Sequence, residues 1–321
     1  MGETVLFPEG WQRKLKLGQQ ALAKQNYQQA VAYLQDAYQE HPDFSTHQQL
    51  LLALEKTGDY RQALALVADY QEDYQEDYLR DPLGFTQVFR LYLLDQHYLT
   101  AKKYLTQGVN NGWVNTKAQK IHEEELALLE KQQLFYDPEL PIVKKAELLQ
   151  IDKSGLPVSQ KNWEEWSQGI TIESFISITE ALLEKISNPF LRPRLVEELL
   201  KLGVTDTLNI CDLQGEIRSC SLSQLVLPEN DPVLLQMLHY LEAEHGHEDP
   251  ALLQGVMSEV QAHFALSFPF SPQSAAPDFW AESYWLEYQV AIGEQDNAVL
   301  VPFSAIQEIK ASYRKLLTAL Y

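Results

Sequence analysis

Residues 17–42, LGQQALAKQNYQQAVAYLQDAYQEHP, decide the fold that we expect for this chain. Small residues recur along the stretch at Gly18, Ala21, Ala30 and Ala37. Two helices can pack closely where such residues face each other, because larger side chains would push the backbones apart. Leu17 and Leu34 supply apolar volume beside these contacts, and Pro42 ends the second helix because proline cannot continue one. The stretch predicts two antiparallel helices joined by a turn at Asn26 and Tyr27.

Two weaker copies of the pattern follow. The second runs from Leu50 through a turn at Gly58-Asp59-Tyr60 to Tyr70, and the third runs from Val88 through a turn at Gln96-His97-Tyr98 to Gly108. Each copy keeps an anchoring alanine, at Ala30, Ala63 and Ala101. Such a repeated pattern is typical of stacked helical hairpins, in which neighbouring units share a continuous core.

The longer gap before the third copy places extra residues between Asp69 and Pro82. Tyr70, Tyr74 and Tyr78 fall there on one helical stripe. We expect an overlong second helix with a solvated acidic face, and the alternative is a tyrosine-rich docking edge.

The three copies resemble the tetratricopeptide repeat (TPR) family, with one good copy and two degenerate ones. The stretches 188–203 and 248–270 are loosely similar to TPR-containing proteins of Gram-positive bacteria whose role is not assigned. The resemblance implies a mainly α fold: a TPR-like right-handed helical superhelix, followed by a second α-helical domain carrying one β-hairpin. It also implies a non-enzymatic scaffold or adaptor.

The inner face of such a superhelix is lined by the first helix of each unit, and it holds a partner protein. Carried over position by position, the resemblance implies a peptide-binding groove lined by Leu15, Lys16, Gln19, Gln48, Gln49, Leu52, Gln87 and Arg90. Glutamine amides can pair with both donors and acceptors of a peptide backbone. We therefore expect an extended or helical protein segment in this groove.

Other occupants of the groove stay open at this stage. Co-chaperone members of the family hold a carboxylate with lysine, asparagine and arginine, but the equivalent places here carry Leu15, Gln19, Gln49, Leu83 and Gln87. This departure argues against a chaperone-tail clamp. The groove could instead be filled by the chain's own C-terminal helices. In a second functional class, the repeats would bind a small signalling peptide or ligand and change the angle between the domains.

The composition argues against several partners. The formal net charge is −20, with 45 acidic against 25 basic residues. Binding to a phosphate backbone requires lysine and arginine, so we expect no nucleic acid and no anionic membrane. Met1–Leu6 shows no basic region followed by an apolar stretch, so we expect no signal peptide and a cytoplasmic location.

The pattern divides the chain into three parts. Residues 1–136 form the repeats with a capping helix over Lys117–Phe135, whose Ile121, Leu126, Leu129 and Leu134 are expected to pack on the last unit. Residues 137–170 are rich in proline and glycine and read as a connecting segment around one helical stretch. Residues 171–321 form a helical domain with a β-hairpin near 207–222, in which Leu208 faces Cys220 and Cys211 faces Ile217. This register disfavours a disulfide between the two cysteines.

The remaining candidates for chemistry are weak. No phosphate-binding glycine loop and no His-Glu-x-x-His motif occurs, and we expect no enzymatic activity and no cofactor. His239, His245 and His247 with Glu248 and Asp249 are the best metal-binding candidates, but His245-Gly246-His247 resembles a helix end, and we assign no metal. The aromatic residues between Phe264 and Tyr288 are expected to pack in a core, with an exposed partner patch as the alternative.

Overall fold

The computed structural model describes residues 10–70, 73–74, 77, 81–271 and 276–318. Within these ranges the chain is mainly helical, with one small two-stranded antiparallel sheet, which confirms the predicted fold class at this level. The chain divides into two compact units. The first is made of Met1–Leu140 and Glu164–Ile172, and the second of Pro141–Trp163 and Glu173–Tyr321.

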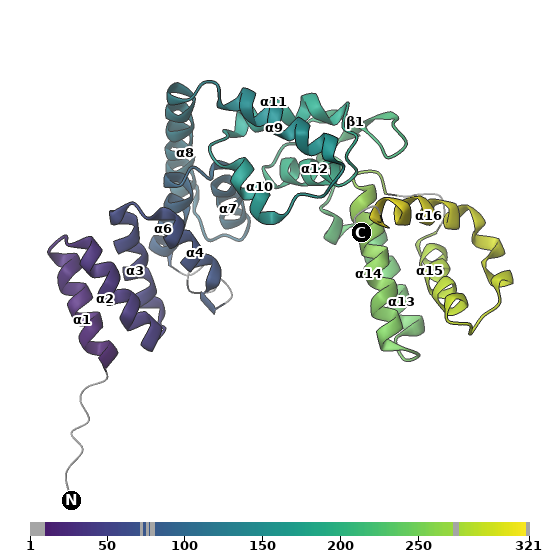
Figure 1. The fold of residues 1–321 in the computed structure, drawn as a ribbon, viewed down its shortest axis with the longest axis horizontal. Helices are drawn as coiled ribbons and strands as arrows, with labels where there is room; N and C mark the ends of the chain where they lie inside the picture. Colours follow the sequence, from purple (N-terminus) through teal and green to yellow (C-terminus); the bar gives the residue numbers. More distant parts are fainter. Residues whose placement is uncertain (1–9, 71–72, 75–76, 78–80, 272–275, 319–321) are drawn as a thin grey trace, which may run out of the picture. The chain divides into compact units, whose positions relative to one another are not determined.

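The first unit is a series of antiparallel helices in which each helix packs on the next (Figure 1). Its helices are α1 (Gly10–Ala23), α2 (Tyr27–Glu40), α3 (Phe44–Thr57), α4 (Tyr60–Asp69), α6 (Pro82–Leu94), α7 (Tyr98–Asn110) and α8 (Thr116–Tyr136). The first helix of each predicted pair also contacts the first helix of the next pair, α1 with α3 and α3 with α6. These contacts are compatible with a helical repeat, and the right-handed superhelix stays a prediction.

The three predicted anchors occupy equivalent places in this series. Ala30, Ala63 and Ala101 are each the fourth residue of their helix, and all three are fully buried. In the turn five residues before each alanine, the backbone is left-handed, at Gln25 (φ 59°), Gly58 (φ 81°) and Gln96 (φ 61°). The same local conformation therefore recurs in all three pairs. The first turn is Lys24–Asn26 and ends one residue earlier than predicted, because Tyr27 already begins α2.

The tyrosines after α4 correct one expectation. The helix ends at Asp69, so it is not overlong, and Tyr70 and Tyr74 pack inward against Tyr38 and His47. The Tyr38 hydroxyl donates to the Tyr74 hydroxyl at 3.1 Å. These two rings belong to the first hydrophobic core rather than to a docking edge, and Tyr78 lies outside the described residues.

Helix α8 packs on the last pair through two of the four predicted residues, Leu126 and Leu129, while Leu134 is half-buried outside that core. Leu126 is buried and Leu129 packs beside it in a core shared with α6 and α7. Ile121 does not pack there, because its position on the helix turns it outward, and 53% of its surface is exposed.

The predicted connecting segment, 137–170, holds two helices, α9 (Leu140–Ser154) and α10 (Gln160–Ser167). Its last part returns to the first unit and closes the turn between α6 and α7. The Gly169 N–H donates to the Gln96 carbonyl at 2.8 Å, and the Gln168 amide donates to the Asp95 carbonyl at 2.9 Å. Two of the three boundaries between the units, after Leu140 and after Trp163, fall within this segment, and the third follows Ile172.

The second unit continues with α11 (Ile172–Leu183), whose first residue still belongs to the first unit, and α12 (Leu191–Lys201). The hairpin follows, with strands β1 (Thr207–Cys211) and β2 (Ile217–Ser221) in the predicted register, in which Leu208 faces Cys220 and Cys211 faces Ile217. Both cysteines are buried free thiols. Three short 3-10 helices and four α-helices complete the unit: η1 (Leu222–Gln224), η2 (Pro228–Asn230), α13 (Pro232–His245), α14 (Pro250–Ser267), α15 (Pro277–Ala291), η3 (Asn297–Phe303) and α16 (Ser304–Thr318).

The predicted aromatic cluster forms the core between α13, α14 and α15. Phe264, Trp280, Tyr284 and Trp285 are all buried there. Phe279 is an exception, with 40% of its surface exposed.

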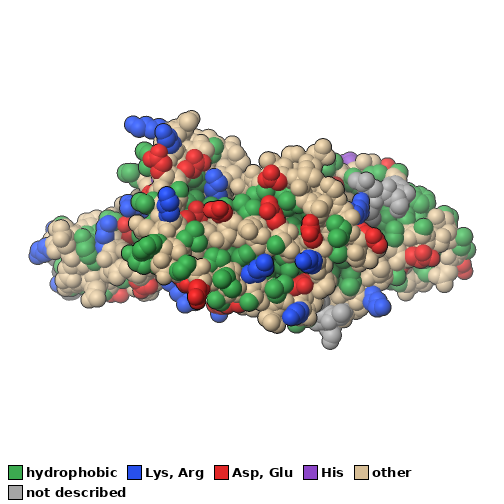
Figure 2. Space-filling model, turned by 90° about the horizontal axis from the view of Figure 1, so that it is seen from above, with side chains coloured by type: hydrophobic (Ala, Val, Ile, Leu, Met, Phe, Trp, Pro, Cys, Tyr) green, Lys and Arg blue, Asp and Glu red, His purple; other side chains and the backbone are tan. Residues whose placement is uncertain are grey.

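The surface carries charges of both signs. On the face drawn in Figure 2, hydrophobic side chains lie among acidic and basic ones. None of the helices in the described ranges combines the length and the apolar character that a membrane crossing needs.

Candidate functional site

A groove lies between α3 and α6 in the first unit, with a volume of about 450 Å³. Its lining residues on α3 are spaced by three and four positions, so that they form one face of the helix: Ser45, Gln48, Gln49, Leu52, Glu55 and Lys56. Leu83, Thr86, Gln87 and Arg90 form the facing side on α6, next to Asp81. The groove is therefore built by two regular helix faces and not by loops.

Core packing fixes the two walls. Leu51 and Leu54 point inward from α3, and Val88 and Leu91 point into the same core from α6. The glutamines lie beside these core positions, are half-buried, and line the groove. Asp81 begins α6 by accepting hydrogen bonds from the backbone N–H groups of Leu83 and Gly84, each at 3.1 Å.

Polar contacts order the glutamine side chains. The Gln48 amide donates to Asp81 Oδ2 at 2.5 Å, and the Gln87 amide donates to the Gln48 carbonyl at 3.4 Å. The Gln49 amide donates to Ser45 Oγ at 3.3 Å. A primary amide has two N–H donors and an acceptor oxygen, so these contacts leave capacity for a ligand.

The charged lining is balanced. Glu55 and Asp81 are acidic, and Lys56 and Arg90 are basic, whereas the whole chain has a formal charge of −20. Arg90 Nε lies 3.0 Å from Glu125 Oε1 on α8. Under Thr86, burial lowers the pKa of His122, so this imidazole is neutral at pH 7 and adds no charge. The groove does not favour a strongly charged ligand of either sign.

Five of the predicted lining residues meet in this groove: Gln48, Gln49, Leu52, Gln87 and Arg90. The three on α1 do not line it. Leu15 is half-buried against the first core, while Lys16 and Gln19 are exposed on α1. Sequence reasoning did not single out Ser45, Glu55, Lys56 or Thr86, although each lies three or four positions from a predicted residue.

The predicted metal candidates do not converge. His245 Nδ1 lies 3.1 Å from Glu248 Oε1, and its Nε2 lies 2.9 Å from Glu282 Oε2, while its ring stacks on Trp285. Asp249 instead begins α14 as its N-cap. Among the residues that the structure describes, no three histidine, cysteine, aspartate or glutamate side chains are grouped so as to hold a metal ion.

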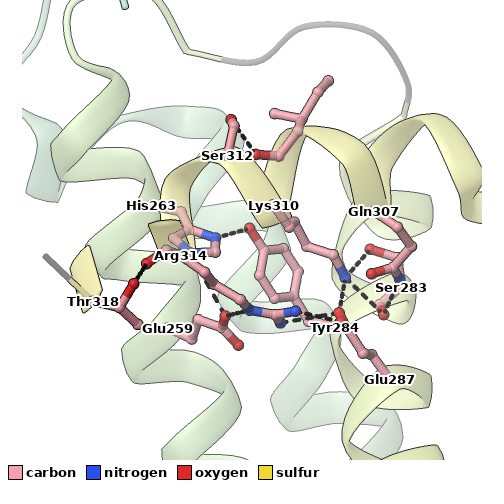
Figure 3. A network of polar contacts seen from close by, with 11 residues as sticks. Glu259, His263, Ser283, Tyr284, Glu287, Gln307, Lys310, Ser312, Arg314 and Thr318 are labelled. Atoms are coloured by element: carbon pink, nitrogen blue, oxygen red, sulfur yellow. Dashed lines mark hydrogen bonds and ion pairs between the residues drawn. The ribbon is translucent and has the colours of Figure 1, made fainter. Parts of the chain in front are cut away.

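A partly buried charge network joins α14, α15 and α16 (Figure 3). Arg314 on α16 bridges Glu259 and Glu287, and Lys310 Nζ lies 2.6 Å from Glu287 Oε2 and donates to the Ser283 carbonyl at 3.0 Å. Burial lowers the pKa of Lys310 to about 8, although Glu287 favours the charged form. A lysine with a lowered pKa can serve as a nucleophile, but Lys310 is fully enclosed, so no substrate reaches it. We assign the network a structural role, in which it fastens α16 to the core.

In comparisons with known proteins, no family model, no curated protein and no solved structure matches this chain. The TPR resemblance therefore stays a prediction that depends on the repeated residues themselves.

Proposed function

We propose that the first unit is a non-enzymatic protein-interaction scaffold, and that the groove between α3 and α6 holds an extended segment of a partner protein. The observation that carries this proposal is the meeting of Gln48, Gln49 and Gln87 in one groove with Leu52 and Arg90.

The chemistry of the groove supports an extended peptide. Peptide backbones present alternating N–H and C=O groups, and the glutamine amides can donate to one and accept from the other. Two exposed leucines, Leu52 (39% exposed) and Leu83 (79% exposed), can cover apolar side chains of the segment. Burying such side chains contributes about 25 cal/mol per Å² of apolar surface.

The test is a selection of linear peptides from a phage-displayed random library, followed by affinity measurement with fluorescence anisotropy. We expect the selected peptides to bind the wild-type chain and to bind the double variant Q49A/R90A at least about tenfold more weakly. The control is R61A/Q62A, which removes the same residue types from exposed positions on α4. Equal affinity for wild type and Q49A/R90A, or a selection that yields no binder, would contradict the proposal.

A further inference from the structure

The outer face of α8 is more apolar than a terminal helix of a repeat array requires. Such a helix covers the core with one face and normally presents polar residues on the other. Here Ile121, Leu128 and Phe135 are 53%, 56% and 81% exposed. Their spacing of seven residues places them in one stripe along the helix, about 10.5 Å apart.

Two charged residues lie within this stripe. Glu124 follows Ile121 by three positions, and Lys131 follows Leu128 by three positions. Both are exposed. Glu124 Oε1 lies 3.9 Å from Lys120 Nζ in an exposed pair on the same helix, and exposed pairs of this kind contribute little to stability. This weak contact leaves Glu124 able to take a better partner.

We propose that α8 is a self-association surface, and that it pairs antiparallel with α8 of a second copy of this chain about a twofold axis at Leu128. Leu128 then meets Leu128 of the second copy, and Ile121 meets Phe135 of the second copy. Such a contact is isologous, so it closes as a dimer. The inference is independent of the groove, because α3 and α6 form the groove.

The charges select the direction of pairing. In the antiparallel arrangement, Glu124 comes within about one residue, 1.5 Å along the axis, of Lys131 of the second copy. The twofold axis repeats this ion pair, so the interface has two. A parallel arrangement would place Glu124 opposite Glu124 and Lys131 opposite Lys131, which is repulsive. The partner that fits both the apolar stripe and its charges is therefore α8 of a second copy in the antiparallel direction.

Analytical ultracentrifugation of the full chain over a range of concentrations tests the proposal. We expect the average mass to rise from that of the monomer toward twice that value, and L128E to stay monomeric. Leu235, 49% exposed on α13, provides the matched control, and L235E should associate like wild type. A wild-type chain that is monomeric at all concentrations, or an L128E variant that still dimerises, would overturn the proposal.

A charge exchange tests the ion pairs. E124K and K131E should each weaken dimerisation by about tenfold, because each replaces attraction by repulsion at two symmetry-related places. The double variant E124K/K131E restores opposite charges and should recover wild-type association. If the double variant is as weak as the single ones, the assigned pairs are wrong. Circular dichroism checks that all variants keep their helices.

Cysteine cross-linking tests the direction. L128C should cross-link to itself, and I121C should cross-link to F135C in a mixture of the two variants. I121C alone should not cross-link, and if it does so efficiently, pairing is parallel and the proposal fails. The unmodified chain is a low-background control, because Cys211 and Cys220 are buried and burial raises the pKa of the Cys220 thiol.

Discussion

Gly18 marks the closest approach between α1 and α2. A Cβ atom built at this position would lie 2.6 Å from Cγ and 2.8 Å from Cδ2 of Leu34. Leu34 is fully buried, and other core side chains surround it. The residue that opened the sequence pattern is therefore a steric requirement of the first helical pair.

We predict that G18A destabilises the chain by about 1–3 kcal/mol, although alanine is by itself about 1 kcal/mol better than glycine within a helix. The overlap with Leu34 decides the sign, because the core is closely packed. The free energy of unfolding, measured in urea, checks this prediction.

A double-mutant cycle gives its control. In the L34A background the cavity left by leucine can take the new methyl group, so G18A should cost little or should stabilise. An equal penalty in both backgrounds would show that the contact with Leu34 is not the cause.

At the scale of elements, the same turn joins the helices of each pair. Its left-handed residue is Gly58 in the second pair, but it is glutamine in the first and third pairs, at Gln25 and Gln96. A side chain costs about 1–2 kcal/mol in this conformation, because Cβ crowds the carbonyl oxygen. The fold therefore tolerates strain in two of the three turns.

We predict that Q25G stabilises the chain by about 0.5–1 kcal/mol, because relief of this strain exceeds the entropy that glycine loses on folding. The β-branched variant Q25V should destabilise by a similar amount. Thermal unfolding followed by circular dichroism measures both. A Q25G variant with a lower melting temperature than wild type would show that the glutamine side chain contributes more than its backbone strain costs.

The elements that the sequence predicted best are those set by local chemistry. Helices α13 and α14 begin at Pro232 and Pro250 as expected, since an aspartate caps each start and proline favours the first turn. The hairpin register followed from Asp212 and Gly215, because Asp212 accepts from the N–H groups of Gln214 and Glu216, and Gly215 adopts a φ of 87°. The residues on the facing walls of the groove were implied by the TPR resemblance, and five of the eight meet there.

The sequence predicted less where tertiary contacts decide. Tyr70 and Tyr74 have a helical spacing, but their contacts with Tyr38 and His47 determine where they lie. Ile121 also lies at a regular helical spacing from other apolar residues of α8. Nothing in the local sequence distinguishes a covered face of this helix from an uncovered one. Whether Leu15, Lys16 and Gln19 on α1 line the groove depends on how successive helical pairs are placed relative to one another. The sequence alone does not specify this placement.

At the scale of the whole molecule, each unit buries an uncharged histidine. Burial lowers the pKa of His47 in the first unit and of His263 in the second unit to about 4. His263 lies 2.7 Å from the Tyr284 hydroxyl and also faces Glu259 and Tyr313, with Glu287, Lys310 and Arg314 in the surrounding network. In the unfolded chain a histidine has a pKa of about 6.5.

We predict that acid destabilises both units. Between pH 6.5 and pH 4 the unfolded chain binds more protons than the folded chain, so stability is complete above about pH 6.5 and falls as the pH decreases. At pH 5, each of these two histidines should lower the free energy of unfolding by about 2 kcal/mol. Urea unfolding at pH 7 and pH 5 measures the loss, and H263Q should lose about 2 kcal/mol less than wild type over this interval.

The matched control is His239, which is exposed on α13. H239Q should have the same pH dependence as wild type. If H263Q and wild type lose equal stability between pH 7 and pH 5, protonation of His263 is not the cause of the acid effect.

The chain passes between its two units three times, because Glu164–Ile172 returns to the first unit before the second is completed. A gene fusion that ended at residue 140 would omit Gly169, whose N–H closes the turn at Gln96, and Ile172, whose N–H donates to Glu130 Oε1 at 2.6 Å. A fusion that ended at residue 172 would carry α9 away from Ser187 and Asn188, whose N–H groups donate to Asp152. Neither fusion point divides the chain into two parts that keep all of these contacts. We therefore expect the two units to have been inherited together and not recombined as separate domains.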